Sequence, residues 1–151
     1  MLLDVAVLAR ALGYAVGRLG CQVSGDGDYG TASDLPWAMA FPDGTVPTDQ
    51  EVHPAPIYET LSMGLLAWVL WRLRDAVRPG ALFALYLLGA GLERFLVEFV
   101  RRNDEVLAGL TAPQLEAAAL AIAGAVWLAI LQRGGGVRAP AGSATARPAV
   151  A

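Results

Sequence analysis

Residues 14–31 read YAVGRLGCQVSGDGDYGT, the end of an apolar segment that runs directly into a glycine-rich, acidic loop. Arg18 stands where the apolar chain gives way to this loop. Glycine supplies the backbone freedom and close approach that a loop folded around a polar ligand needs. Because glycine-rich loops are common, an interfacial arginine followed by a flexible turn explains the spacing equally well. The five glycines of the stretch are Gly17, Gly20, Gly25, Gly27 and Gly30.

The composition of the 151-residue chain is more apolar than that of a typical soluble domain, with 56% hydrophobic residues and a mean hydropathy of +0.48. The net charge is −3, and the eleven basic residues, all arginines, form no basic stripe, so we expect no nucleic-acid partner. The single cysteine, Cys21, excludes an internal disulfide framework and a multi-cysteine metal site. We expect neither a metal nor a cofactor. No removable signal peptide is predicted, because no basic region precedes a small-residue cleavage site.

Four apolar segments are predicted to be membrane-spanning helices. The first is a weak span by hydropathy because it contains charged residues, and it fits better as a helix packed inside a bundle. The expected fold class is all-α, a polytopic membrane helical bundle with about four transmembrane segments and one long outward-facing loop. The predicted spans are 2–23, 57–71, 81–100 and 115–131.

The segment from Ser24 to Pro56 is the predicted long loop. Its length suits either a functional or a disordered segment, and the apolar patch at 35–41 favours a structured loop with a short hairpin near the membrane surface. Residues 1–132 are predicted to form the membrane domain, and residues 133–151 a disordered cytoplasmic tail. Alternation of four spans puts two arginine groups on one side, which is cytoplasmic by the positive-inside rule. These arginines are Arg72, Arg74, Arg78, Arg133, Arg138 and Arg147.

Ionisable residues within the third predicted span point to a functional role. Arg94, Glu98 and Arg101 are spaced at i, i+4 and i+7 and are predicted to share one helical face. Arg94 would lie about 20 Å into a slab of about 30 Å, at the level of Arg18. Two arginines at headgroup depth suit a phospholipid phosphate, because guanidinium binds phosphate with two hydrogen bonds. The alternative is a structural Arg94–Glu98 pair that joins helices.

The only histidine, His53, lies in the long loop shortly before Tyr58 and Glu59. A single loop histidine is usually solvated or stabilises a turn, although it can also serve as a base near pH 7. Tyr58 can be an interfacial aromatic residue and Glu59 a carboxylate at a helix N-terminus.

Short motifs along residues 14–115 resemble those of the bacterial prolipoprotein diacylglyceryl transferases. The signature of that family reads Gly-Arg-x-Gly-Asn-Phe-x-Asn-Gly-Glu-x-x-Gly, and the stretch 17–31 is similar to it. Further matches follow in the order of the family, at 34–37 with 41–42, 53–54 with 58–59, 94–101, and 109–111 with Gln114.

The resemblance implies a multi-pass protein of the bacterial inner membrane. Such proteins transfer diacylglyceryl from phosphatidylglycerol to the lipobox cysteine of a preprolipoprotein signal peptide and release glycerol phosphate, so the expected partners are these two substrates and membrane lipids. By position, Arg18 and Arg94 match the two essential arginines, and Asp26 stands where the family has glutamate. These three are the predicted catalytic residues. The predicted substrate-binding residues are Gly25, Glu98, Arg101, His53 and Tyr58.

The chain also departs from the family pattern. Cys21 and Ser24 replace signature asparagines, and the loop up to Gly30 is one residue longer. The resemblance implies seven membrane spans for members of the family, whereas this chain begins near the fourth span and lacks the His-Gly-Gly motif of the first half. The chain is therefore either an enzyme, whole or split, or a non-catalytic phospholipid-binding membrane protein or inactive paralog. A small transporter is a weaker alternative, since no internal repeat is present.

Overall fold

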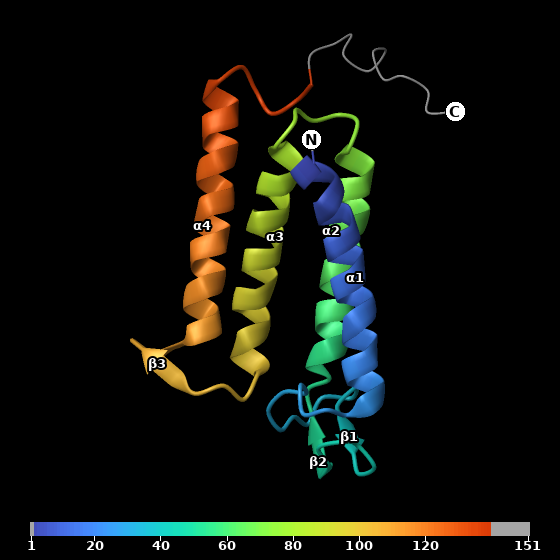
Figure 1. Ribbon diagram of the computed structural model, residues 1–151. Coiled ribbons are helices and arrows are strands. Elements are labelled where there is room, and N and C mark those ends of the chain that lie inside the picture. The colour runs from blue at the N-terminus through green and yellow to red at the C-terminus, as the bar shows by residue number, and fades with distance from the viewer. Residues whose placement is uncertain (1, 140–151) are drawn as a thin grey trace, which may run out of the picture.

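The computed structural model describes residues 2–139, which form four long helices lying side by side with alternating direction (Figure 1). Each predicted span falls within or beside one of these helices, so the mostly helical character expected from the sequence is confirmed. The helices are α1 (Leu2–Ser24), α2 (Ala55–Leu73), α3 (Ala81–Val97) and α4 (Ala112–Arg133).

Two short antiparallel hairpins add to the helices, so the all-α prediction is incomplete. The first pairs β1 (Met39–Phe41) with β2 (Thr48–Val52), and the second pairs β3 (Glu105–Leu107) with β4 (Leu110–Thr111). The first hairpin is the one expected inside the long loop. Both lie at the end of the bundle where α1 and α3 finish and α2 and α4 begin (Figure 1).

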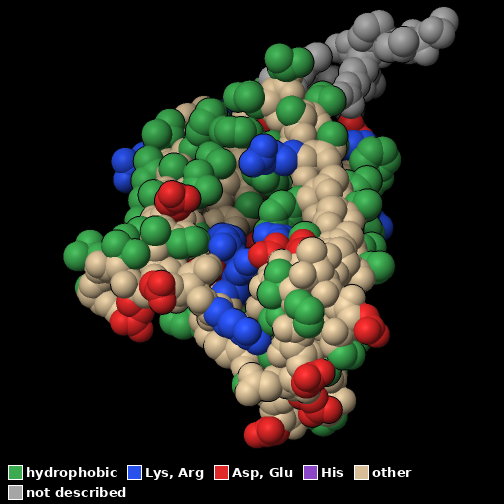
Figure 2. All heavy atoms as spheres, turned by 60° about the horizontal axis from the view of Figure 1, so that its bottom comes forward, with side chains coloured by type: hydrophobic (Ala, Val, Ile, Leu, Met, Phe, Trp, Pro, Cys, Tyr) green, Lys and Arg blue, Asp and Glu red, His purple; other side chains and the backbone are tan. Residues whose placement is uncertain are grey.

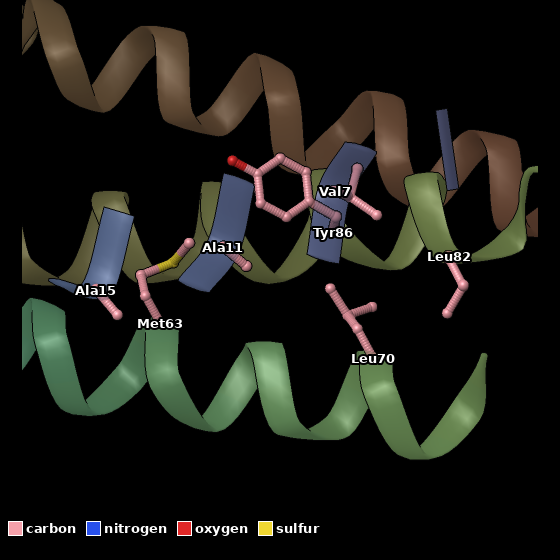
Figure 3. Packing of buried hydrophobic residues seen from close by; sticks show 7 residues of the cluster. All are labelled: Val7, Ala11, Ala15, Met63, Leu70, Leu82 and Tyr86. Carbon is pink, nitrogen blue, oxygen red and sulfur yellow. The ribbon is translucent and has the colours of Figure 1, made fainter. Parts of the chain in front are cut away.

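The buried cluster joins three helices through residues at helical spacing (Figure 3). On each helix the spacing of four or seven residues puts the buried side chains on one face. Small alanines on α1 let its backbone approach the larger side chains of α2 and α3. The members are Val7, Ala11 and Ala15 of α1, Met63 and Leu70 of α2, and Leu82 and Tyr86 of α3.

Helices α3 and α4 pack backbone against backbone at two glycines. A Cβ atom added at Gly91 would lie 2.6 Å from the carbonyl oxygen of Ala117, and one at Gly124 would lie 2.5 Å from the amide nitrogen of Leu88. No side chain fits at such distances, so the close approach of these helices requires glycine at both positions.

Helix α4 is, within residues 2–139, the one helix long and apolar enough to cross a membrane by length and composition. It starts at a capping box: the Thr111 side chain accepts a hydrogen bond from the Gln114 amide, and the Gln114 side chain accepts one from the Thr111 amide. This cap satisfies backbone donors that the helix itself leaves unpaired.

The segment after α4 pairs with the turn between α2 and α3. The Arg78 amide donates to the Val137 carbonyl at 2.9 Å, and the Ala139 amide donates to the Ala76 carbonyl at 3.0 Å. Residues 134–139, which we expected to be disordered, are thus tied to the end of the bundle opposite the hairpins. The rest of the expected tail, 140–151, lies outside the described residues.

Candidate functional site

Charged side chains from separate parts of the chain meet at the hairpin end of the bundle. Figure 2 shows basic side chains gathered in a hollow on this face, with acidic side chains against them. They come from the last turns of α1 and α3, the segment that follows α3, the first turns of α2 and the glycine-rich loop.

Glu59, in the second turn of α2, is the centre of this cluster. Its side chain has no exposed surface, and its Oε2 lies 3.0 Å from Arg18 Nε and 3.4 Å from Arg101 Nη1. Its Oε1 lies 3.5 Å from Arg94 Nη1 and accepts a hydrogen bond of 3.0 Å from the Tyr14 hydroxyl. A buried carboxylate is costly unless it is paired and hydrogen-bonded, and here three guanidinium groups and a phenol satisfy it.

A second carboxylate, Asp28, bridges two of the same arginines from the solvent side. It forms ion pairs with Arg18 and Arg101, and its side chain is 33% exposed. Partial burial acts to raise the pKa of Asp28, but the hydrogen bond from Arg101 and the charges of Arg101 and Arg18 outweigh it, so this pKa lies below its usual value.

Glu98 connects the cluster to the start of α4. Its Oε2 lies 3.0 Å from Arg94 Nη2, and its Oε1 accepts a hydrogen bond of 2.9 Å from the Thr111 hydroxyl and another from the Asn103 amide. Arg94 Nη1 has no hydrogen bond of good geometry, although it lies at ion-pair distance from Glu59. Arg94 is therefore held from two sides and keeps donor capacity for an anion.

Among the groups that these ion pairs join, the charges balance formally. Three arginines face three carboxylates, one of which is partly exposed while the other two are buried. At Arg18 and Arg101, an anionic ligand must therefore compete with a carboxylate for the guanidinium groups.

The structure brings together four of the predicted residues, Arg18, Arg94, Glu98 and Arg101. The expected helical face is wrong in one respect: α3 ends at Val97, a 3₁₀ turn (η1, Glu98–Val100) follows, and Arg101 has an extended backbone. Arg101 reaches Glu59 from beyond the helix end. The Arg94–Glu98 pair considered as the structural alternative is present as well.

Asp26 lies beside the arginine contacts but does not make them. Its side chain is exposed, and its Oδ1 accepts a hydrogen bond of 3.2 Å from the Asp28 amide. Asp26 is predicted as catalytic because it stands where the family has glutamate, but the carboxylate that forms ion pairs with Arg18 and Arg101 is Asp28. The ligand atoms of Cys21, Asp26 and Asp28 lie within 4.8 Å of one another, but the two guanidinium groups on Asp28 disfavour a cation there.

Gly25 has a structural reason for being glycine. Its φ is +56°, and a Cβ atom there would lie 2.8 Å from the Cα atom of Gly44. The amides of Thr45 and Val46 donate to the carbonyls of Ser24 and Gly25 at 2.8 Å. Gly25 therefore lets the glycine-rich loop pack onto the turn of the first hairpin.

His53 and Tyr58 form a separate polar group with Trp37. The Trp37 Nε1–H donates to the Tyr58 hydroxyl at 2.8 Å, and that oxygen lies 3.2 Å from His53 Nδ1. The His53 backbone accepts a hydrogen bond from the Gly30 amide and donates one to the Thr31 carbonyl. This group thus fixes the end of the glycine-rich loop against the start of α2.

Sequence comparison identifies the family to which this chain is related. The sequence profile of the prolipoprotein diacylglyceryl transferases matches residues 1–130. The chain belongs to this family. The match confirms the resemblance drawn from the short motifs.

Relatives with the family's name are considerably longer than this chain. The phosphatidylglycerol–prolipoprotein diacylglyceryl transferase of Methylobacillus flagellatus is 37% identical over 137 residues, which cover 86% of this chain and 50% of that protein. The protein of the same name from Rhodospirillum rubrum is 33% identical over 148 residues, 92% of this chain and 53% of its own length. That from Idiomarina loihiensis is 44% identical over 96 residues, 62% of this chain and 34% of its own length. This diacylglyceryl transferase family member thus spans about half the length of the curated relatives it matches, or less.

Sequence reasoning missed the central residue of this family member's cluster. Glu59 was interpreted as a helix N-terminal carboxylate, although it is the only acidic residue in an otherwise apolar segment, a pattern that signals a buried partner. Asp28 has no such signal, because it is one of several acidic residues in the loop. Tyr14 and Asn103 of the network were not proposed as site residues, and Thr111 and Gln114 were noted only as part of a family motif.

Proposed function

We propose that this chain takes part in the transfer of diacylglyceryl from phosphatidylglycerol to the lipobox cysteine thiol of a preprolipoprotein. The observation that carries the proposal is the set of three arginines around Glu59 and Asp28 at one end of the bundle. The names of the relatives, which contain both phosphatidylglycerol and prolipoprotein, support the choice of substrates.

The chemistry needs positive charge where the phosphate leaves. The cysteine thiolate attacks the carbon of the diacylglyceryl group that bears the phosphate. The new carbon–sulfur bond forms, and the carbon–oxygen bond breaks with its electrons on the departing glycerol phosphate. Arg18, Arg94 and Arg101 stabilise the charge on that leaving group, since preorganised donors act strongly in a site with little water. Glu59 and Glu98 hold the guanidinium groups in place for this task.

The remaining predicted residues surround these three arginines in the proposal. Asp26, an exposed carboxylate next to Asp28, would orient the glycerol hydroxyls of the donor or the peptide. His53 and Tyr58, with the exposed Trp37, would line the approach of a substrate, and Gly25 would act through the shape of the loop.

We further propose that all four helices cross the bacterial inner membrane with the hairpin end outward. The charged cluster would then lie in the outer leaflet, where phospholipid headgroups are. The arginines near the opposite end would face the cytoplasm by the positive-inside rule. Residues 1–132 form the membrane domain in this proposal, and the tail follows on the cytoplasmic side.

The test is mass spectrometry of a synthetic lipobox peptide incubated with the purified chain in phosphatidylglycerol vesicles. A gain of one diacylglyceryl group on the peptide cysteine is expected from the wild type and not from Arg18→Ala. Arg72→Ala, which removes an exposed arginine at the opposite end of α2, is the matched control and keeps the activity.

A second candidate is a non-catalytic phospholipid-binding protein, because the arginine cluster suits the binding of a phosphate whether or not a transfer follows. A parallel reaction adds the half of the Methylobacillus flagellatus protein that lies outside its match to this chain. Transfer only in that mixture identifies one part of a two-part enzyme. No transfer in either reaction, with retained binding of phosphatidylglycerol, would favour the non-catalytic candidate.

A further inference from the structure

The two carboxylates that bridge Arg18 and Arg101 differ in how firmly they are held. Glu59 is fully buried on α2 and is also bound by Tyr14, so it is a fixed part of the bundle. Asp28 is on the loop, and its side chain is 33% exposed. The same pair of guanidinium groups thus has one permanent partner and one that solvent, or a dissolved anion, can reach.

The loop is fixed on both sides of Asp28 but not at Asp28 itself. Before it, the Gly25 amide donates to Cys21 and the Gly25 carbonyl accepts from Val46. After it, the Tyr29 hydroxyl donates to the Val46 carbonyl at 2.8 Å, and the Thr31 amide donates to the Val100 carbonyl at 2.8 Å. Asp28 can therefore leave the arginines through a change confined to residues 26–28, at the cost of its two ion pairs and the local Asp26 turn.

The space held by Asp28 has the chemistry of a phosphate site. Guanidinium groups bind carboxylate and phosphate oxygens in the same way, with paired N–H donors. If Asp28 withdraws, Arg18 Nη1 and Arg101 Nη2 are released while Arg18 Nε and Arg101 Nη1 stay on Glu59. The released donors come from two chain segments and face one gap.

We propose that Asp28 is an internal competitor for the phosphate group of an anionic ligand, which takes the place of the Asp28 carboxylate between Arg18 and Arg101. The inference rests on the proposed function for the site and adds how ligand entry is regulated. The apparent affinity for phosphate is lowered by the fraction of time in which Asp28 occupies the gap. Without Asp28 the site binds phosphate more tightly, because no carboxylate on the loop then competes for the guanidinium donors of Arg18 and Arg101.

The test is calorimetric titration of inorganic phosphate into the detergent-solubilised full chain, as the wild type and as Asp28→Asn. Asparagine keeps the shape of aspartate without its charge. We expect phosphate to bind about tenfold more tightly, because a competitor held by charge-assisted hydrogen bonds has been lost. Asp49→Asn makes the same change at an exposed position of β2 and should bind like the wild type. Equal or weaker phosphate binding by Asp28→Asn would overturn the proposal, as would an equal gain in Asp49→Asn.

A second measurement needs no variant. Hydrogen exchange of the Asp28 amide, which is hydrogen-bonded to Asp26, should accelerate when phosphate is added to the wild type, while the Thr31 amide stays protected. If hydrogen exchange of the Asp28 amide is unchanged when phosphate is bound, the proposal that phosphate replaces the Asp28 carboxylate is overturned.

Lipid nanodiscs separate the two sources of phosphate. If Asp28→Asn binds phosphatidylglycerol nanodiscs more tightly than the wild type does, and phosphatidylcholine nanodiscs show no such gain, the site is assigned to the lipid headgroup. If Asp28→Asn gains affinity for inorganic phosphate and for neither type of nanodisc, the site is assigned to the free anion. Both results support the competition. The peptide-transfer assay is independent of this readout: tighter phosphate binding without transfer contradicts only the proposed function, and transfer without any change in binding contradicts only the competition.

Discussion

Arg94 shows how a single side chain can serve two partners at once. Its Nη1 and Nη2 point to different carboxylates, Glu59 and Glu98, on different elements. The planar guanidinium makes this possible, and it leaves donor capacity for a phosphate, whereas a lysine ammonium is a point charge.

The first prediction at this scale is that Arg94→Lys keeps the fold but loses transfer. We expect a decrease of about 100-fold or more in the rate of diacylglyceryl transfer, the typical effect of removing one donor to a developing anion. The initial rate with a lipobox peptide measures it, and Arg72→Lys, at the far end of α2, is the control. A wild-type rate in Arg94→Lys would contradict the proposed role of the Arg94 guanidinium in binding the phosphate.

The second prediction concerns acid. Because the pKa of Asp28 is lowered in the folded protein, its ion pairs stabilise the fold above the pKa of an unfolded aspartate, about 3.9, and this contribution is lost as the pH falls through the lower folded-state pKa. Thermal unfolding of the wild type and Asp28→Asn should differ by a constant amount at neutral pH, with the wild type more stable. The difference should narrow below about pH 4. A difference that widens on acidification would contradict this account.

At the scale of the elements, the contact between α3 and α4 determines where Glu98 lies. Gly91 and Gly124 let the two backbones touch, and this contact brings the capped start of α4 to the end of α3. The Thr111 hydroxyl can then donate to Glu98. A helix cap, usually a local device, here also holds a carboxylate of the charged cluster.

The third prediction is therefore that Gly124→Leu separates α3 from α4. The new side chain would meet the Leu88 amide nitrogen and the Ala84 carbonyl oxygen, so we expect a loss of about 1–3 kcal/mol or more in the free energy of unfolding. Ala123→Leu makes a similar change at the neighbouring, exposed position of α4 and serves as the control. Denaturant unfolding of both variants gives the comparison, and equal stability would show that the contact tolerates a side chain.

At the scale of the whole molecule, the alternating direction of the helices brings four helix ends together. The ends of α1 and α3 and the starts of α2 and α4 meet at the hairpins, and the arginine-rich links lie at the opposite end (Figure 1). The proposed membrane orientation relies on the arginines at that opposite end, because Arg18, Arg94 and Arg101 at the hairpin end are paired with carboxylates.

The fourth prediction tests that orientation with single cysteines in a Cys21→Ser background. Asp43→Cys, in the turn of the first hairpin, should react with a membrane-impermeant maleimide on intact spheroplasts. Arg138→Cys, at the other end, should react only after lysis. Reaction of both cysteines on intact spheroplasts would contradict a bundle that crosses the membrane.

The sequence by itself predicted the four helices, the hairpin in the long loop, the family, and Arg18 and Arg94 as candidate site residues. These depend on local signals: the length of apolar segments, turn residues, short motifs, and charges in apolar surroundings that require a partner. Only the tertiary structure decided which partner each arginine has. Glu59 is central, and Asp28 contacts the arginines while Asp26 does not, because these contacts join α1, α2, the loop and the end of α3. Spacing along the chain does not specify which of several carboxylates reaches across to another element, since that depends on how the helices pack.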